Sequence, residues 1–130
     1  MLKKILISSV FAAVVMFSGG ANAELQSALA NICEIVKTDD KAELRKKMKN
    51  VRSNFKLKLK DYYSGITCGG KSLIKLAIEN NATEAGTLLV KKMPKKLLSQ
   101  PEQDGVVLLT WITDNGLTDN PVSQVLQERL

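Results

Sequence analysis

The sequence contains no histidine. Catalytic triads, the most frequent general bases and the nitrogen ligands of most zinc sites use that residue, so these chemistries are excluded. Cysteine is scarce as well, because Cys33 and Cys68 are the only two in 130 residues. If the two cysteines are paired, thiolate catalysis and zinc–thiolate sites are excluded too. We therefore expect a protein that is not an enzyme and has neither a metal site nor a cofactor.

Carboxylates are the one catalytic group that this composition leaves open, because a pair of them can hydrolyse a glycoside. The candidate acids mostly sit at predicted helix starts, where capping explains them. These acids are Asp39, Asp40, Glu43, Glu79 and Glu84.

Long apolar runs are missing from the chain beyond residue 17. The one apolar run, residues 5–17, is shorter than the roughly 20 residues that a membrane-spanning helix needs. Two lysines precede this run and Ala21-Asn22-Ala23 follows it, which is typical of a secretory signal peptide. We therefore predict that residues 1–23 are a cleaved leader and that residues 24–130 form a single domain in the periplasm or outside the cell. The alternative is an uncleaved membrane anchor.

The predicted export determines the expected oxidation state of the two cysteines. In an oxidising compartment an even pair usually forms a disulfide, and only the pairing of Cys33 with Cys68 is available. It would close a loop of about 36 residues, worth roughly 3 to 4 kcal/mol in the chain-entropy model. The alternative is two free, buried thiols.

Helical spacing of apolar residues dominates the mature chain. One apolar face over residues 25–36 predicts a first helix, and Asp40 with Glu43 predicts the start of a second. The apolar seam of the second helix consists of Leu44, Met48, Val51 and Phe55. Residues 55–60 alternate like a strand but also continue this seam, so we expect a helix end or a short irregular segment there.

Capping residues predict the later helices. Ser72 is a good N-cap for a helix over 73–80, and Thr83 for one over 84–93. A further helix is expected near residues 106–112, and Asn120-Pro121 reads as the N-cap and first residue of the last helix. The predicted fold is all-α.

Residues 70–81 resemble half of an ankyrin unit, although the Thr-Pro-Leu-His signature of that family is absent. One or two units are too few for a solenoid. We therefore predict a small single domain of stacked helical hairpins, locally ankyrin-like, with one disulfide.

The stretch from Gly65 to Ser72 matches the Walker A pattern GxxxxGKS of phosphate-binding loops. That motif requires a preceding buried parallel strand and several βα units, and neither is predicted here. A cystine at Cys68 would also constrain a loop that must wrap around phosphate. We interpret the stretch as a glycine-rich loop that carries a cystine and begins a helix.

Charge is distributed unevenly along the chain. Removing the leader lowers the net charge from +6 to +4, because two lysines leave with it. Residues 41–60 contain nine lysines and arginines and one acid, whereas residues 101–130 contain five acids and one arginine. The candidate anion-binding residues of the basic segment are Arg45, Lys46, Lys47, Lys49, Arg52, Lys56, Lys58 and Lys60. Export disfavours nucleic acid as the partner and favours anionic lipid headgroups or lipopolysaccharide, while the alternative is a solvated helix face.

Two further stretches carry a family resemblance: Tyr63-Ser64-Gly65-Ile66-Thr67-Cys68-Gly69-Gly70-Lys71-Ser72-Leu73 and Ala77-Ile78-Glu79-Asn80-Asn81. Together with the leader, the Ile-Cys pair and the basic second helix, they resemble a family of small secreted gammaproteobacterial proteins catalogued as a domain of unknown function. The resemblance covers about residues 25–96. It implies an exported bacterial protein with its two cysteines paired, and it supplies no activity and no site residues.

Two functions follow from these patterns. The first is a small periplasmic, non-enzymatic module that binds a protein partner through the turn near Asn80 and Asn81 or through the acidic segment 101–130. The alternative is a cationic binder of an anionic envelope component that uses residues 41–60.

Overall fold

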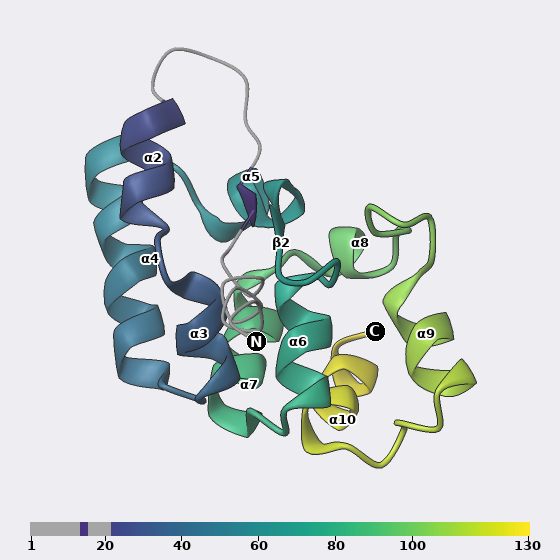
Figure 1. Cartoon of the computed structure of the whole chain (residues 1–130). Coiled ribbons are helices and arrows are strands. Elements are labelled where there is room, and N and C mark those ends of the chain that lie inside the picture. Colours follow the sequence, from purple (N-terminus) through teal and green to yellow (C-terminus); the bar gives the residue numbers. More distant parts are fainter. Residues whose placement is uncertain (1–13, 16–21) are drawn as a thin grey trace, which may run out of the picture.

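The computed structural model describes residues 14–15 and 22–130 (Figure 1). Most of the predicted leader lies outside the described residues, so its cleavage stays a prediction. The elements run in the order β1 (Val14–Val15), α2 (Asn22–Ala28), α3 (Ile32–Lys37), α4 (Lys41–Phe55), α5 (Leu59–Tyr62), a 3-10 turn (Tyr63–Gly65), β2 (Ile66–Thr67), α6 (Leu73–Glu79), α7 (Thr83–Lys92), α8 (Lys95–Leu98), α9 (Leu108–Asp114) and α10 (Pro121–Arg129).

The helices form stacked hairpins. Helices α3 and α4 make one hairpin, and α6 and α7 make the next. Helix α3 packs on α6 while α4 packs on α7, so equivalent helices of the two hairpins lie together. Helix α10 covers both α6 and α7, which extends the same layers (Figure 1). The predicted all-α single domain of stacked, ankyrin-like hairpins is confirmed.

A small antiparallel strand pair, absent from the sequence prediction, joins β1 to β2. Val14 pairs with Thr67 and Val15 with Ile66. Each strand is two residues long, so the pair adds little to a fold that is otherwise helical.

Three predicted helix starts are confirmed by their side-chain caps. Asp40 Oδ1 accepts the Glu43 N–H of α4 at 3.2 Å, and Ser72 Oγ accepts the Lys75 N–H of α6 at 3.3 Å. Asn120 Oδ1 accepts the Val122 N–H at 2.8 Å, with Pro121 as the first residue of α10. Each cap satisfies a backbone donor that the helix itself leaves unpaired.

Two local predictions were wrong. The first helix is two helices, because Asn31 takes up a left-handed conformation with φ 66° between α2 and α3. Thr83 is the first residue of α7 and not its cap. The free donor at this helix start is instead satisfied from a distant turn, where Asp39 Oδ1 accepts the Ala85 N–H at 2.7 Å.

The segment after α4 is irregular, as predicted. Helix α4 ends at Phe55, and Lys56 follows in a left-handed conformation with φ 59°. The helix expected near residues 106–112 begins at Leu108, two residues later than its apolar residues suggest. The short helix α8 was not predicted, since Leu97 and Leu98 alone give no helical period.

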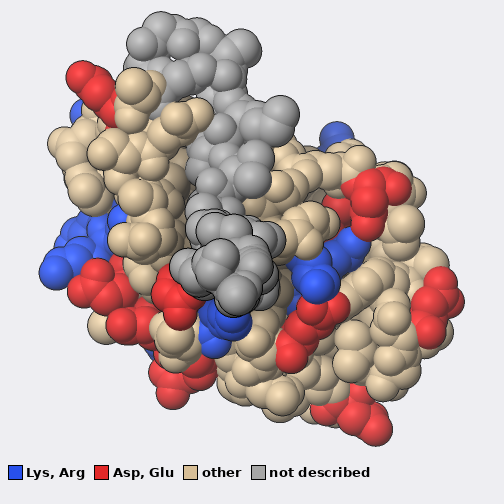
Figure 2. All heavy atoms as spheres, in the orientation of Figure 1, with Lys and Arg blue, Asp and Glu red and all other residues tan. Residues whose placement is uncertain are grey.

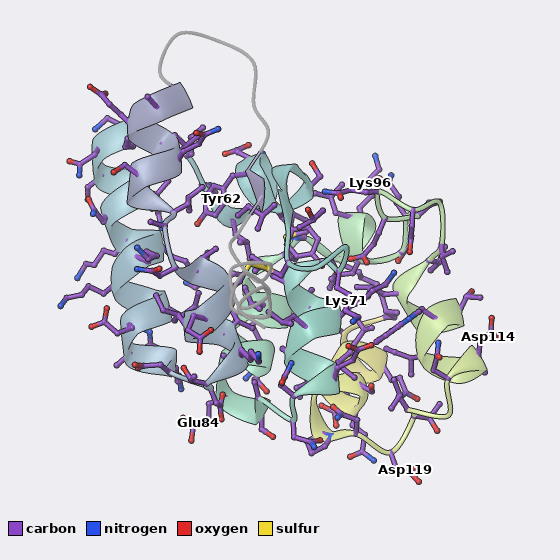
Figure 3. The ribbon with its side chains drawn as sticks, in the orientation of Figure 1. Tyr62, Lys71, Glu84, Lys96, Asp114 and Asp119 are labelled. Carbon is purple, nitrogen blue, oxygen red and sulfur yellow. A yellow bond between two sulfur atoms is a disulfide. The ribbon has the colours of Figure 1, made fainter. Side chains whose placement is uncertain are left out.

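The predicted disulfide is confirmed. It joins Cys33 of α3 to Cys68, which lies between β2 and α6. The two Cα atoms are 5.8 Å apart, within the usual range for a disulfide. Both cysteines are buried, and the bond lies between α3 and α6 in the middle of the molecule (Figure 3). The cross-link therefore fastens the first hairpin to the start of the second.

Gly86 of α7 lies at the closest approach of three helices. A Cβ atom on this residue would stand 2.5 and 2.8 Å from the two methyl carbons of Val122 in α10, and 3.1 Å from the Cβ of Ala77 in α6. We expect Gly86→Ala to cost about 1–3 kcal/mol, because overpacking forces the neighbouring backbone apart. Urea unfolding would measure the loss.

The matched control for this prediction is the double variant Gly86→Ala with Val122→Ala. The smaller side chain at 122 makes room for the new methyl group, so the two changes together should be less destabilising than the sum of the single changes. Purely additive losses would show that contact with Val122 is not the cause.

Candidate functional site

Two cavities stand out in the described part of the chain. The larger, of about 570 Å³, is formed by α6, α8 and the segment 100–108. The smaller, of about 360 Å³, lies between α4, α5 and α7. The larger is lined by charges of both signs, whereas the charged residues that line the smaller are all cationic.

A buried ionic network forms one wall of the larger cavity. Lys75 Nζ, on α6, lies 2.5 Å from Asp104 Oδ2 and 3.7 Å from Glu102 Oε1. The Lys75 and Glu102 side chains are only 7% and 8% exposed. The Lys75 ammonium also lies 5.3 Å from the centre of the Trp111 ring, within cation–π range. One cation therefore meets two carboxylates and an aromatic ring.

Two hydroxyl groups complete the network around Glu102. Tyr63 Oη donates to Glu102 Oε2 at 2.6 Å, and Ser72 Oγ donates to Glu102 Oε1 at 2.9 Å. Ser72 is also the N-cap of α6, so its hydroxyl accepts one hydrogen bond and donates another. Since both Glu102 oxygens have donors, we interpret the network as a fastening that holds residues 101–104 against α6.

Burial dominates the electrostatics of this network. It raises the pKa of the Glu102 carboxyl, although the hydroxyls of Tyr63 and Ser72 and the Lys75 charge oppose the shift. Burial, followed by the Glu102 charge, also raises the pKa of Tyr63 well above its usual value, so Tyr63 remains a donor. The more exposed Asp104 has a lowered pKa, first because Lys75 donates a hydrogen bond to it.

The raised pKa of Glu102 predicts a pH dependence. The pKa of Glu102 is near 4.5 in the unfolded chain and higher in the folded protein. At pH values between the two, the folded protein holds the Glu102 proton more tightly than the unfolded chain does. The stability that this group contributes is therefore present below its unfolded pKa and is lost as the pH rises through its folded pKa. Urea midpoints measured from acid to neutral pH should show this slope in the wild type and not in Glu102→Gln.

The pH comparison needs a control for Asp104, whose lowered pKa acts in the opposite direction and removes stability as pH falls. Because Asp104 is present in both proteins, its contribution cancels when Glu102→Gln is subtracted from the wild type. A wild-type curve parallel to that of Glu102→Gln would contradict the assignment to Glu102.

The smaller cavity collects part of the basic segment. Four of the predicted anion-binding residues line it, and a fifth cation from α7 joins them. These five are Arg45, Lys49, Arg52, Lys58 and Lys92. Lys92 lies 32 or more residues further along the chain, so only the packing of α7 on α4 reveals its place.

The other four candidates of the basic segment lie away from this cavity. Lys46 is paired with Glu43 on the exposed face of α4 at 3.7 Å. Lys47 donates to the Ala28 carbonyl oxygen at 3.0 Å, which fastens α4 to α2, and Lys56 donates to the Ser53 carbonyl oxygen at 3.3 Å. Lys60 pairs with Asp61 at 3.2 Å and lines the larger cavity instead.

No carboxylate of the described residues lines the smaller cavity, although Asp61 lies close enough to interact electrostatically with Lys58 and Tyr62. None of the cavity's five cations has an ion pair with another described residue. By contrast, acidic and basic side chains are interspersed over the face shown in Figure 2. The positive charge of the cavity is therefore a local feature and does not reflect a uniformly basic surface.

The Tyr62 hydroxyl is an unpartnered donor beneath the lining of the same cavity. The Tyr62 side chain is fully buried and lines the cavity, and its hydroxyl has no hydrogen-bond partner among the described atoms. Tyr62 lies inside the fold, whereas Lys96, Asp114 and Asp119 lie at the periphery (Figure 3). Burial, with a smaller effect of the Asp61 charge, raises the pKa of Tyr62 to about 12, so the hydroxyl keeps its proton.

The Walker A match has a structural explanation. The matched stretch itself contains the two-residue strand β2, which pairs antiparallel with β1, and its Cys68 is held by the disulfide. Lys71 pairs with Glu79 at 3.0 Å, and the Ser72 hydroxyl is bonded to Glu102. The glycine-rich loop thus carries a cystine and begins a helix, as predicted.

The family of the chain follows from its sequence. A family model described as a protein of unknown function (DUF3718) matches residues 32–100, just over half of the 130 residues. The chain belongs to the DUF3718 family. No curated protein and no solved structure matches the chain. The DUF3718 match confirms the predicted family of unknown function, and it covers α3 to α8, including the disulfide and the whole smaller cavity.

No helix in residues 14–15 and 22–130 has the length and apolar character to cross a membrane. In the same ranges, no three acidic or cysteine side chains gather closely enough to hold a metal ion. Within the DUF3718 region, the basic cavity between α4, α5 and α7 is the candidate functional site, because five cations line it.

Proposed function

We propose that this chain is an exported, non-enzymatic binding protein whose cationic surface around α4, α5 and α7 binds an anionic component of the cell envelope. The observation that carries this proposal is the smaller cavity, where five cations face the same space with no carboxylate among its described lining. Five like charges repel each other and raise the energy of the unbound protein, and the nearby Asp61 offsets only part of that repulsion. An anionic ligand relieves that repulsion.

Export is supported by two independent features. The leader pattern at residues 1–23 is one, and the buried disulfide is the other, since disulfides persist in oxidising compartments such as the periplasm. The envelope surfaces that such a protein meets are rich in phosphate-bearing lipids and glycolipids. Periplasmic or secreted localisation therefore supplies suitable anionic partners.

The absence of an enzymatic activity is also part of the proposal. Asp39 and Asp40 cap helices, Glu79 pairs with Lys71, and Glu102 belongs to the buried network. Each of these carboxylates has a structural partner that accounts for its position. With no histidine in the chain, the remaining chemistry supports binding better than catalysis.

Vesicle sedimentation tests the proposed function. The full chain, expressed with its own leader and purified, should sediment with phosphatidylglycerol vesicles and not with phosphatidylcholine vesicles. The association should weaken strongly from low to physiological ionic strength, because salt screens exposed charges. Failure to bind anionic vesicles at low ionic strength would contradict the proposal.

The other predicted function, binding of a protein partner, has less support. At the turn expected to form its face, Asn80 Nδ2 donates to the Leu76 carbonyl oxygen and Asn120 Nδ2 donates to Asn81 Oδ1. Side-chain groups of this turn are thus used within the fold. Protein binding stays a prediction, and we rank the anionic partner first.

A further inference from the structure

The smaller cavity combines two kinds of lining. Its cations come from three separate segments: α4, the irregular residues 56–58 and α7. Between them lie apolar side chains, namely Met48, Leu57, Leu59 and Leu88. A volume of about 360 Å³ is within the range of small-molecule sites. The lining therefore suits a ligand with a charged end and an apolar body.

The Tyr62 hydroxyl lies beside the cavity and lacks an acceptor, but it is closed off from the open space of the cavity. A buried hydroxyl without a partner costs about 1–3 kcal/mol relative to one that is hydrogen-bonded. Tyr62 Oη bears this cost, because it is shielded from solvent and bonded to no described atom. The hydroxyl is protonated at neutral pH, so what it lacks is an acceptor oxygen.

We propose that the cavity between α4, α5 and α7 binds the phosphate monoester group of an amphiphilic lipid, with the cations of the lining as donors. This inference rests on the proposed function and makes it more specific. The proposed function needs only a cationic surface, whereas this inference requires a defined cavity that binds one type of headgroup. The lipid's phosphate occupies the cationic part of the cavity, and its first carbons contact the leucines.

The charge of the lining favours a phosphate monoester over other anions. A monoester carries about −1.5 to −2 charges at neutral pH and three acceptor oxygens, whereas a carboxylate carries one charge and two oxygens. Arg45 and Arg52 present planar guanidinium groups that match phosphate oxygens in pairs. The lysines contribute further charge from the other walls of the cavity.

A matched pair of double variants tests whether the cavity itself binds. Lys49→Gln with Lys92→Gln removes two charges from the lining, one from α4 and one from α7. Lys46→Gln with Lys91→Gln removes two charges from exposed positions on the same two helices, outside the lining. Both variants have the same composition and net charge, so any difference between them reports on position alone.

Calorimetric titration with dihexanoyl phosphatidic acid, which is soluble as a monomer, measures the affinity. We expect saturable binding by the wild type, about tenfold or greater weakening in the variant at 49 and 92, and less than about threefold weakening in the variant at 46 and 91. Dihexanoyl phosphatidylcholine, which has the same chains and no monoester, should not bind. Inorganic phosphate should compete only weakly, because it lacks the apolar body.

Tyr62→Phe tests the hydroxyl without changing charge or shape. Because the hydroxyl is shielded from the open cavity, this change should alter the lipid affinity by less than about threefold. The same change should leave the urea midpoint of the unbound protein unchanged or raise it, because the hydroxyl has no partner to lose. A loss of about tenfold or more in Tyr62→Phe would contradict a phosphate held by the cations of the lining.

The outcomes separate this inference from the proposed function. Equal weakening in the two double variants, or tight binding of inorganic phosphate alone, would overturn the lipid site while vesicle association still supports a cationic surface. No saturable binding of dihexanoyl phosphatidic acid would overturn it as well. Binding of that lipid without association to anionic vesicles would leave the cavity intact and contradict the envelope-surface function.

Discussion

Replacing Lys75 with methionine is expected to destabilise the fold by about 3–5 kcal/mol at neutral pH, because removing one partner leaves a buried charge without compensation. The Glu102 carboxylate is only 8% exposed, and Lys75 is the one cation that the described structure places next to it. Methionine has a similar length and packs well, so a cavity does not explain the loss. Urea unfolding at pH 7 measures the change.

The double variant Lys75→Met with Glu102→Gln is the control for this prediction. It removes both charges of the buried pair and keeps an oxygen that can accept from Tyr63 or Ser72. Because an apolar or neutral replacement of a buried ion pair is often close to neutral, we expect the second change to recover part of the loss. The single variant should also become less destabilising at acid pH, where Glu102 is protonated. A loss below about 1 kcal/mol would show that the pair matters little.

Removing the disulfide is the second change with a large expected effect. Cys33→Ala with Cys68→Ala should lower the free energy of unfolding by roughly 3 to 4 kcal/mol, since the bond closes a loop of about 36 residues. Alanine is chosen because both sites are buried and a serine would bury a hydroxyl. Chemical denaturation of the variant and the oxidised wild type gives the difference.

Burial of the cystine adds a kinetic expectation. Cys33 and Cys68 are each 4% exposed, so a reductant reaches the sulfurs mainly when the domain opens. Reduction of the folded wild type should be slow and should accelerate in moderate urea. Rapid reduction without denaturant would show that the loop around Cys68 opens on its own.

Much of the fold could be predicted because its signals are local. Asp40, Ser72 and Asn120 are caps recognised from their own few neighbours, and the structure confirms all three. The disulfide could be predicted because only one pairing exists. The break at Asn31 could not, because the apolar period continues through it and only the backbone geometry reveals the turn.

Only part of the candidate site could be predicted, because the rest depends on contacts between segments that are distant in the sequence. The basic segment was recognised from its composition, but four of its eight candidates lie elsewhere, since helix geometry sends neighbouring lysines to different faces. Lys92 and Tyr62 were missed because their roles depend on contact between α4, α5 and α7. The pairing of Lys75 with Glu102 likewise joins residues 27 positions apart, which no local pattern indicates.

The Glu102 fastening has a consequence for the relation between this chain and its family. The matched region ends at residue 100. Glu102 and Asp104 lie just beyond that end, yet they pair with Lys75, which lies inside the region. Helix α10, further on, covers α6 and α7. A chain shortened to residues 32–100 would leave the buried Lys75 ammonium without its two carboxylates. It would also expose the apolar surface of α6 and α7 that α10 covers. The matched region, residues 32–100, therefore packs against the last thirty residues and draws two carboxylates from them.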